Sequence, residues 1–397
     1  MKQTKTLLFL LTLIVSLMAC QSIQKKDMHR IEVVSYIRTW PLGSTQEEIE
    51  KNINWKAEDI RGDMIDMLNI SFGLLTQNNK IYIPEYNGKD EKKRTFPNLF
   101  QEVEKLKKKY PSLKINLSVG GWGADGFSDM AASRENRETF IKDAIDWIKK
   151  HNLDGLDIDW EYPVGPDWGL PIKTRPEDAQ NFILLLQETR EALNLAEKEL
   201  GRPLGLSIAV PASTWYVEKI DIKEVEKYIT YFKIMCYDYY GAWSDTTGHH
   251  TNLYNNPSDP AWGGWSTDQA IQLYLEKGIA PEKILMGVAF YGRAWKGVMP
   301  ENNGLFQPYK EAAFPDGISY TDIEKLEKSG EYTRYWDDLA KAPFLYNGDT
   351  WITYDDRESL DYKIKYIEEK GLGGIMVWEY GHDIEERLYS FLHEKAR

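Results

Sequence analysis

The chain of 397 residues has 49 lysine and arginine residues against 62 aspartate and glutamate residues, a formal net charge of −13. This acidic excess argues against a general nucleic-acid binder, because most of the surface would repel a polyanion. Hydrophobic residues make up 42% and charged residues 28%, as in an ordinary globular protein, whereas aromatic residues reach 13%. Most of these rings belong in the core, and the remainder are candidates for a surface that stacks on sugars.

The N-terminal segment has the pattern of an export signal. A lysine-containing start precedes an almost unbroken apolar run, residues 7–18, which is too short for a permanent membrane span. The run ends in Leu17-Met18-Ala19-Cys20, which resembles the bacterial lipoprotein signal. We therefore expect a signal peptide over residues 1–19, a lipid on Cys20, a tether over residues 20–29 and anchoring to the bacterial cell envelope. An ordinary cleaved signal with an incidental cysteine is the alternative.

Strand-like segments recur along the rest of the chain. They begin near Ile31, Leu68, Lys114, Leu153, Leu204, Tyr231, Lys283 and Gly373. Amphipathic helical patterns lie between them, for example over residues 140–148 and 182–193. A later helix is predicted over residues 356–370, with Asp356 as its N-cap and Gly371 at its end. Eight strands alternating with helices predict an α/β protein with a (β/α)₈ barrel, and an open doubly wound sheet is the alternative.

One interval breaks this alternation. The seventh strand is predicted to end near Trp295, and the stretch up to Asp356 is far longer than a βα loop requires. It is rich in turn residues and contains further strand-like pieces. We predict a small α+β subdomain over residues 298–349, inserted into a catalytic barrel formed by residues 30–297 and 350–397. Because barrel active sites lie at the C-terminal ends of the strands, the insertion would form a wall of the site.

The fourth predicted strand carries the strongest chemical signal, in the segment Asp154-Gly155-Leu156-Asp157-Ile158-Asp159-Trp160-Glu161. Side chains alternate between the two faces of a strand, so Asp157, Asp159 and Glu161 share one face and the apolar residues share the other. The apolar face suits the helix layer, and the acidic face therefore points into the barrel. Carboxylates spaced about 6.6 Å apart repel one another, and at least one is expected to be protonated near neutral pH.

Such a carboxyl is suited to act as a general acid. Glu161, the outermost of the three, would be kept protonated by burial and by Asp159 beneath it. Two alternatives are an acidic strand paired with a buried arginine or lysine, and a divalent-metal site. The histidines show no ligand spacing, so we expect no metal and no cofactor; they are His29, His151, His249, His250, His382 and His393.

Further motifs stand at corresponding places on other predicted strands. They are Ser118-Val119-Gly120-Gly121-Trp122 on the third strand, Met235-Cys236-Tyr237-Asp238 on the sixth, Phe290-Tyr291-Gly292-Arg293 on the seventh, Trp378 on the eighth, and Tyr335-Trp336-Asp337-Asp338 and Tyr354-Asp355-Asp356 in or beside the insertion. Together with the DGxDxDxE pattern of the fourth strand, they make the chain from Val33 onward resemble glycoside hydrolase family 18, the chitinase family, with its insertion domain.

The resemblance implies hydrolysis without an enzymic nucleophile. Glu161 would protonate the glycosidic oxygen and later activate water, while the substrate's own 2-acetamido oxygen attacks C1 to give an oxazolinium intermediate and a retained anomeric configuration. Asp159 would orient the acetamido nitrogen, and Asp157 would share a proton with Asp159. Tyr237 would donate its hydroxyl to the acetamido oxygen.

The resemblance also implies a set of substrate contacts. Trp378 would form the floor of the sugar site, and Trp122 and Trp243 would stack on sugars toward the leaving group. Tyr36 and Phe72 would line the pocket. The remaining expected contacts are Met235, Asp238, Tyr291 and Arg293.

The alternation of side chains along a strand predicts the environment of two other residues. Cys236 lies on the face opposite Met235 and Tyr237, so we predict a buried core thiol rather than a reactive one. Glu379 lies opposite Trp378, which argues against a second catalytic carboxylate there.

The expected partner is an oligosaccharide or polysaccharide that contains N-acetylglucosamine, of the β-1,4-linked chitin type. We expect a monomer that binds no nucleic acid and meets the membrane only through its lipid. One alternative is an endo-β-N-acetylglucosaminidase acting on N-glycans or peptidoglycan. Another is an inactive, sugar-binding relative, which the presence of Glu161 disfavours.

Overall fold

Eight parallel strands close into a barrel, as the alternation of strands and helices predicted. The computed structural model describes residues 30–41, 54–84, 86–87, 90–94, 98–166, 169–261 and 265–397, and residues 31–397 form one unit. The predicted signal peptide, the tether and Cys20 lie outside the described residues. The barrel strands are β1 (Glu32–Arg38), β2 (Met67–Leu75), β6 (Lys114–Gly120), β7 (Gly155–Asp159), β8 (Gly205–Pro211), β9 (Tyr231–Met235), β10 (Ile284–Ala289) and β16 (Gly374–Trp378). Each pairs with its neighbours in parallel, and pairing of β1 with both β2 and β16 closes the barrel.

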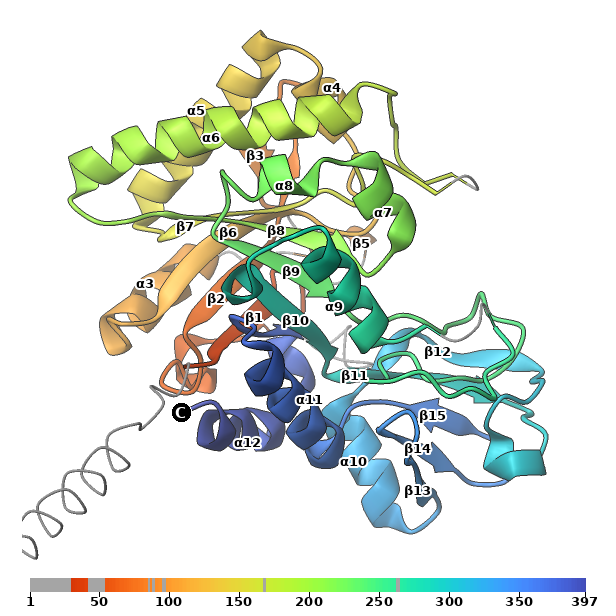
Figure 1. The fold of residues 1–397 in the computed structure, drawn as a ribbon. Coiled ribbons are helices and arrows are strands. Elements are labelled where there is room, and N and C mark those ends of the chain that lie inside the picture. Colours follow the sequence, from red (N-terminus) through yellow and green to blue (C-terminus); the bar gives the residue numbers. More distant parts are fainter. Residues whose placement is uncertain are drawn as a thin grey trace, which may run out of the picture. The chain divides into compact units, whose positions relative to one another are not determined.

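Helices surround the barrel (Figure 1). The two longest, α5 (Arg134–His151) and α6 (Asp178–Leu200), lie side by side. The other helices around the barrel are α3 (Leu99–Lys109), α4 (Phe127–Ala131), α7 (Thr214–Lys219), α8 (Ile222–Val225), α9 (Thr267–Glu276), α11 (Arg357–Lys370) and α12 (Arg387–Lys395), with short 3₁₀ turns η1 (Ala57–Asp59), η2 (Pro281–Lys283) and η4 (Tyr380–His382). No helix in the described part of the chain is long and apolar enough to cross a bilayer.

Helix α11 shows how local sequence sets an element's limits. Asp356 has extended backbone, and its carboxylate accepts hydrogen bonds from the backbone N–H groups of Glu358 and Ser359, which satisfies donors that a helix start leaves unpaired. The helix ends at Gly371 with φ of 67°, a left-handed conformation that glycine adopts without strain. Both ends agree with the prediction from the sequence.

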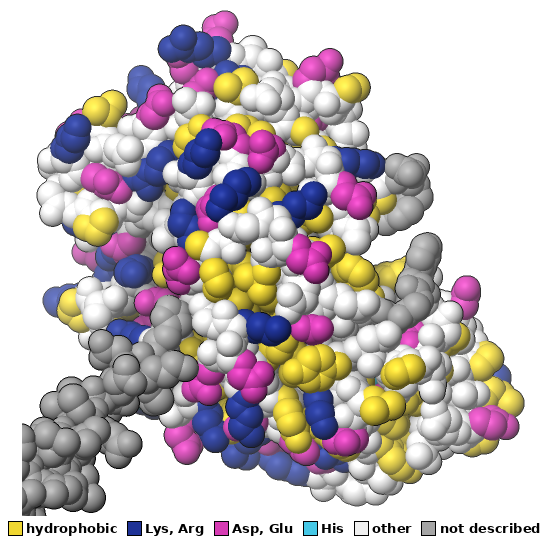
Figure 2. Space-filling view, viewed as in Figure 1, with side chains coloured by type: hydrophobic (Ala, Val, Ile, Leu, Met, Phe, Trp, Pro, Cys, Tyr) yellow, Lys and Arg dark blue, Asp and Glu magenta, His cyan; other side chains and the backbone are white. Residues whose placement is uncertain are grey.

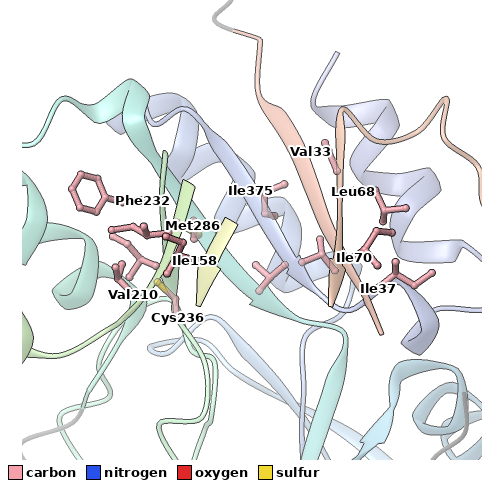
Figure 3. Close-up of a cluster of buried hydrophobic side chains, with 14 of the residues drawn as sticks. Val33, Ile37, Leu68, Ile70, Ile158, Val210, Phe232, Cys236, Met286 and Ile375 are labelled. Carbon is pink, nitrogen blue, oxygen red and sulfur yellow. The ribbon is translucent and has the colours of Figure 1, made fainter. Parts of the chain in front are cut away.

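The core lies between the barrel strands and the helices. Figure 3 shows apolar side chains from most of the barrel strands, among them Ile70 on β2 and Ile158 on β7, gathered on the outer side of the strands. Beyond the end of β7, Trp160 packs between the rings of Phe127 and Phe182. The outward parity predicted for the apolar residues of this segment is therefore confirmed.

The antiparallel sheet of the insertion extends beyond the range expected from the sequence. Its strand order is β12-β11-β15-β14-β13. The sheet begins at Tyr291 and ends at Thr353, outside both limits of the expected range 298–349. The elements are β11 (Tyr291–Lys296), η3 (Glu301–Gly304), β12 (Glu311–Ser319), α10 (Tyr320–Ser329), β13 (Thr333–Asp337), β14 (Ala342–Tyr346) and β15 (Trp351–Thr353).

The cause of the difference lies at Phe290. This residue separates β10 from β11, and its backbone N–H donates to the carbonyl of Trp378 while its own carbonyl accepts from Tyr320. The apolar run from β10 into β11 is continuous in sequence and therefore predicts a single strand. The second half instead belongs to the insertion, whose own core includes Trp295 and Trp351.

Short strands complete the fold. Strand β3 (Ile81–Tyr82) pairs with the end of β2, and β4 (Tyr86–Asn87) pairs with β5 (Asp90–Arg94). On the face shown in Figure 2, basic and acidic side chains are intermixed, and neither sign forms a broad area. On this face the acidic excess is therefore spread out, in keeping with a solvated surface.

Candidate active site

Strand β7 carries the predicted acidic residues from the barrel interior to the C-terminal end of the barrel. Asp157 is fully buried, Asp159 is nearly so, and Glu161 lies buried two residues beyond the end of the strand. Asp157 contacts residues from four other barrel strands, which places this face of β7 inside the barrel. The inward orientation predicted from parity is confirmed.

Asp157 is held by four donors. Its Oδ2 accepts hydrogen bonds from the hydroxyls of Tyr36 at 2.8 Å and Ser118 at 2.7 Å. Its Oδ1 accepts from Ser207 Oγ at 2.6 Å and from the buried ammonium of Lys233 at 2.9 Å. Burial alone would raise the pKa of Asp157, but Lys233 and the hydroxyl donors outweigh it and lower this pKa.

These contacts bear on two expectations. The proton sharing expected between Asp157 and Asp159 stays a prediction, and the ammonium of Lys233 disfavours it because an ammonium donates only to a lone pair of the carboxylate. The alternative of an acidic strand paired with a buried lysine is correct for Asp157. Tyr36, expected to line the pocket, is buried with its hydroxyl bound to Asp157 and its ring 5.7 Å from that of Trp378.

Asp159 and Glu161 form a proton-holding pair. Burial, the charge of Glu161 and the charge of Asp157 together raise the pKa of Asp159 well above its usual value. The pKa of Glu161 is raised to about 7, chiefly by burial and further by Asp238, while Tyr162 opposes the shift. Among the described residues, no hydrogen-bond partner reaches Asp159 Oδ1. The pair therefore retains a proton near neutral pH and has a buried oxygen able to accept a hydrogen bond from a bound molecule.

Two glycines at the end of the third barrel strand allow this arrangement: Gly120 is the last residue of β6, and Gly121 follows it. Gly120 has φ of 125°, and a Cβ there would lie 2.0 Å from the backbone oxygen of Asp159. Gly121 donates its N–H to the same oxygen at 2.9 Å, and a Cβ there would meet the ring of Phe72 at 2.6 Å. The glycines thus let β6 approach the acidic strand while the Phe72 ring lies against the backbone.

Tyr237 and Asp238 follow the end of β9. The Tyr237 hydroxyl lies 3.9 Å from the sulfur of Met376, a weak hydrogen bond that leaves it available to a stronger acceptor. Asp238 accepts hydrogen bonds from Tyr291 and from two guanidinium nitrogens of Arg293, each at 2.8 Å. The structure therefore brings together three of the expected contacts, Asp238, Tyr291 and Arg293.

The charge of Asp238 is fixed by its surroundings. Burial would raise its pKa, but the His250 imidazole and the Arg293 guanidinium lower it well below the usual range. His250 Nδ1 lies 3.6 Å from Asp238 Oδ1. Asp238 is thus a partly buried carboxylate that orients Tyr291 and Arg293 and adds negative potential near Glu161.

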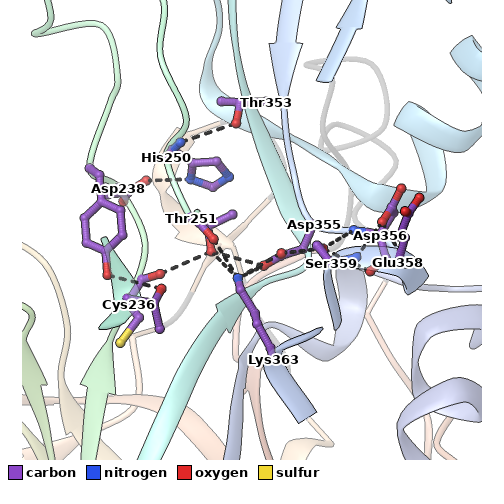
Figure 4. A network of polar contacts seen from close by, with 12 residues as sticks. Cys236, Asp238, His250, Thr251, Thr353, Asp355, Asp356, Glu358, Ser359 and Lys363 are labelled. Atoms are coloured by element: carbon purple, nitrogen blue, oxygen red, sulfur yellow. Dashed lines mark hydrogen bonds and ion pairs between the residues drawn. The ribbon is translucent and has the colours of Figure 1, made fainter. Parts of the chain in front are cut away.

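A second network, which is largely buried, lies behind Asp238 (Figure 4). Lys363 of α11 donates to both oxygens of Asp355, at 2.8 and 2.6 Å, and to the backbone oxygen of Thr251 at 2.7 Å. The Thr251 hydroxyl donates to the carbonyl of Cys236 at 3.1 Å. The network therefore ties the segment that carries Tyr237 and Asp238 to the last long helix of the barrel.

Aromatic rings surround the inner part of the site. Phe72 and Trp378 are stacked with ring centroids 5.5 Å apart, and Tyr36 lies 5.7 Å from Trp378. Trp40, which the sequence analysis did not single out, stacks on Phe72 with the ring centroids 6.2 Å apart. Met235 packs against the same cluster. Trp378 and Phe72 therefore stack on each other in one cluster, and their contact with sugar stays a prediction.

Trp122 and Trp243 are exposed to an unusual degree for tryptophan, at 65% and 62%. The guanidinium of Arg293 lies over the Trp243 ring, 5.3 Å from its centroid, which links this ring to Asp238. Trp122 directly follows the Gly120-Gly121 pair. Large exposed rings beside a polar site are suited to stacking on a sugar ring.

Two further predictions are confirmed. Cys236 is fully buried, and burial raises the pKa of its thiol to about 12. Glu379 is fully buried, and the side chain and backbone N–H of Arg38 bind its carboxylate, so Glu379 has a structural role.

In the described ranges no group of three or more histidine, cysteine, aspartate or glutamate residues is arranged to hold a metal ion.

Sequence reasoning missed Lys233, Tyr162 and the Asp355–Lys363 pair. Lys233 could have been found, because it lies two and four residues before Met235 and Tyr237 and so shares their face of the strand. No local signal marks the pairing of Lys363 with Asp355, since it depends on how distant segments pack.

A closed parallel barrel with a proton-bearing carboxyl pair at the C-terminal end of its fourth strand, beside stacked and exposed aromatic rings, is typical of a glycosidase. Residues 32–383 match the family model described as Glycosyl hydrolases family 18, and the chain belongs to that family.

Relatives and solved structures agree with this membership. The chain is 38% identical over 306 residues to Chitinase A1 of Niallia circulans, covering 73% of this chain and 44% of that protein. It is 36% identical over 282 residues to Chitinase 1 of Aphanocladium album, covering 69% and 63%. The chain thus spans less than two thirds of the length of these curated relatives.

Two solved structures extend the comparison. A family 18 N-acetylglucosaminidase from Paenibacillus barengoltzii matches with a TM-score of 0.76 and 33% identity, covering 92% of this chain and 99% of that one. The chitinase ChiW from Paenibacillus sp. str. FPU-7 matches with a TM-score of 0.81 and 35% identity, covering 92% and 42%.

Proposed function

We propose that this protein is a retaining glycosidase that cleaves β-1,4-linked N-acetylglucosamine, as in chitin or chito-oligosaccharides, with the substrate's acetamido group as nucleophile. The observation that carries the proposal is the state of the carboxyl groups around the site. Burial raises the pKa values of Asp159 and Glu161, whereas Asp157, Asp238 and Glu379 are each bound by cationic or hydroxyl donors. None of these three is available to attack C1.

In the first step Glu161 donates its proton to the glycosidic oxygen as the bond from C1 to that oxygen breaks. The acetamido carbonyl oxygen attacks C1 and closes the oxazolinium ring. Asp159 accepts a hydrogen bond from the acetamido N–H through the oxygen that has no partner among the described residues, and its negative charge stabilises the developing positive charge. The Tyr237 hydroxyl donates to the acetamido oxygen.

In the second step water attacks C1 and the ring opens. Glu161, now a carboxylate, takes a proton from this water and returns to its starting state. Two displacements at C1 leave the anomeric configuration unchanged. The stacked rings of Phe72 and Trp378 supply the apolar floor, and Trp122 and Trp243 supply platforms for neighbouring sugars.

The direct test replaces Glu161 by glutamine and measures hydrolysis and binding of chito-oligosaccharides. We expect hydrolysis to fall by about 10²- to 10⁴-fold, the range for loss of a general acid, while binding followed by tryptophan fluorescence persists. Glu58→Gln is a matched control, because its side chain is 75% exposed. Full activity of Glu161→Gln would overturn the assignment of Glu161 as the acid. Hydrolysis of the matching glucoside, which lacks the acetamido group, by the native enzyme would overturn the substrate-assisted mechanism.

A second candidate is an N-acetylglucosaminidase, either one that releases N-acetylglucosamine from chain ends or an endo-β-N-acetylglucosaminidase that cleaves N-glycans or peptidoglycan. The match that covers 99% of a family 18 N-acetylglucosaminidase favours it. Mass analysis of the products from defined chito-oligosaccharides, run beside a glycoprotein and peptidoglycan, separates the candidates. Internal cleavage of chito-oligosaccharides supports the chitinase, whereas monosaccharide release or turnover of the other substrates supports the second candidate.

We also propose that the protein is exported and lipid-anchored to the bacterial cell envelope through Cys20. The support is the charged start, the apolar run and the Leu17-Met18-Ala19-Cys20 sequence. Metabolic labelling with a radioactive fatty acid tests this: the native chain is expected to incorporate the label and Cys20→Ala to lose it. Absence of label from the native chain would contradict the anchor.

A further inference from the structure

A buried cation lies beneath the proton-holding pair. Lys233 on β9 is fully buried inside the barrel, with its ammonium 2.9 Å from Asp157 Oδ1 and 4.9 Å from the centre of the Tyr36 ring. Burying an ammonium is costly unless it is paired, and a ring face and a carboxylate are the two groups that stabilise a cation here. Burial lowers the pKa of Lys233, and Asp157 opposes that shift, so the contact places an ammonium beside the carboxylate farthest from the substrate.

The contacts of Asp157 favour its ionised form, and the ammonium of Lys233 is the strongest of them. A carboxylate has about four acceptor directions, and Tyr36, Ser118, Ser207 and Lys233 occupy two at each oxygen. Lysine has no acceptor, so its contact requires a lone pair on Asp157. Asp159 is in the opposite situation, because Oδ1 is buried without a partner among the described residues.

Other groups facing this part of the barrel do not replace the lysine. The titratable or charged residues that face it from the surrounding strands and their ends are Tyr36, Asp159, Glu161, Tyr162, Lys233, Tyr237, Asp238, Tyr291 and Arg293. Arg293 is bound to Asp238 at the mouth of the site. From β10 and β16, the inward residues Leu285 and Met376 are apolar.

We propose that Lys233 is a positioning residue that holds Asp157 permanently as a carboxylate, so that the catalytic proton is exchanged only between Asp159 and Glu161. This inference rests on the proposed function and assigns the route of its proton. When the acetamido N–H donates to Asp159, the single proton of the pair passes to Glu161, from which it reaches the leaving oxygen. Asp157 neither gains nor loses a proton during the cycle.

The test replaces Lys233 by methionine, which has similar length and no charge. Removal of a nearby cation raises the pKa of carboxyl groups, so both limbs of the pH profile of kcat/KM on a chito-oligosaccharide are expected to move to higher pH by about one to three units. A residue that only fills space would lower kcat or stability and leave the profile in place. An unmoved profile would overturn the proposal.

A double-mutant cycle locates the effect. In an Asp157→Asn background, Lys233 has lost the charge it neutralises, and adding Lys233→Met is expected to shift the profile by less than half as much as in the native background. Equal shifts in both backgrounds would contradict action through Asp157. Lys233→Arg, which keeps the charge, is expected to retain the native profile.

A spectroscopic measurement does not depend on turnover or on a folded lysine variant. Infrared difference spectra of ¹³C-aspartate-labelled native protein and Asp157→Asn report the protonation of Asp157 directly. We expect only a carboxylate signal between about pH 5 and pH 8. A protonated carboxyl signal in this range would overturn the inference. If no N-acetylglucosamine oligosaccharide is hydrolysed, the proposed function fails, and the infrared result still decides the state of Asp157.

Discussion

Replacing Glu161 by glutamine is expected to stabilise the folded protein at alkaline pH while it removes hydrolysis. Burial raises the pKa of Glu161 from 4.5 to about 7. A carboxyl group whose folded pKa exceeds its unfolded pKa makes the fold less stable as pH rises through that interval, and the full cost remains above it. Below the unfolded value the cost is absent. Glutamine carries no charge at any of these pH values and therefore avoids the cost.

The difference between the unfolded pKa of 4.5 and the folded pKa of about 7 sets the size of this stability gain. At about 1.4 kcal/mol per pH unit, it corresponds to a gain of about 3.5 kcal/mol in the free energy of unfolding for the variant above pH 7. The gain should shrink steadily toward acid pH and vanish near the unfolded pKa.

Urea unfolding of both proteins, at a series of pH values on either side of this interval, measures the gain. The comparison is valid if the dependence on urea is the same for both, since a change in that slope would signal a changed unfolded or native state. Glu58→Gln, at an exposed site, should show no such trend. A stability difference that is independent of pH, or that grows toward acid pH, would refute the argument.

Three further outcomes follow from the site. Glu161 must be protonated to act as the acid, and its pKa is about 7. The value of kcat/KM should therefore fall about tenfold for each pH unit above 7. A kcat/KM that stays constant to strongly alkaline pH would contradict the role of Glu161 as the acid. Trp243→Ala should raise KM for long oligosaccharides by about tenfold with little change in kcat or in the unfolding midpoint, since the ring is 62% exposed; an unchanged KM would remove Trp243 from the sugar site. Gly120→Ala would place a Cβ 2.0 Å from the backbone oxygen of Asp159. The free energy of unfolding should therefore fall by about 1–3 kcal/mol and turnover by about 10²-fold. Native turnover would show that β6 can shift to accommodate the methyl group without displacing Asp159.

Much of the barrel could be predicted from the sequence, because its signals are local. Each barrel strand is a short apolar segment between helical patterns, and alternation along β7 places Asp157 inside and Trp160 outside without reference to any other segment. The cap at Asp356 and the terminal Gly371 likewise depend only on neighbouring residues.

The remaining features depend on contacts between distant segments. The apolar run through Phe290 gives no sign that the chain passes from the barrel to the insertion, since that change is made by hydrogen bonds to Trp378 and Tyr320. The ionisation of Asp157 depends on donors from four other strands. Parity indicates that Lys233 faces inward, but its partner is set by how the barrel closes.

The anomeric form of the first product tests the central claim most directly. Proton NMR of a chito-oligosaccharide during the first minutes of hydrolysis distinguishes the β-anomer from the α-anomer before they interconvert. Substrate-assisted catalysis with Glu161 as the acid predicts that the β-anomer appears first, because two displacements at C1 retain the configuration. Initial release of the α-anomer would mean a single displacement by water and would contradict the account.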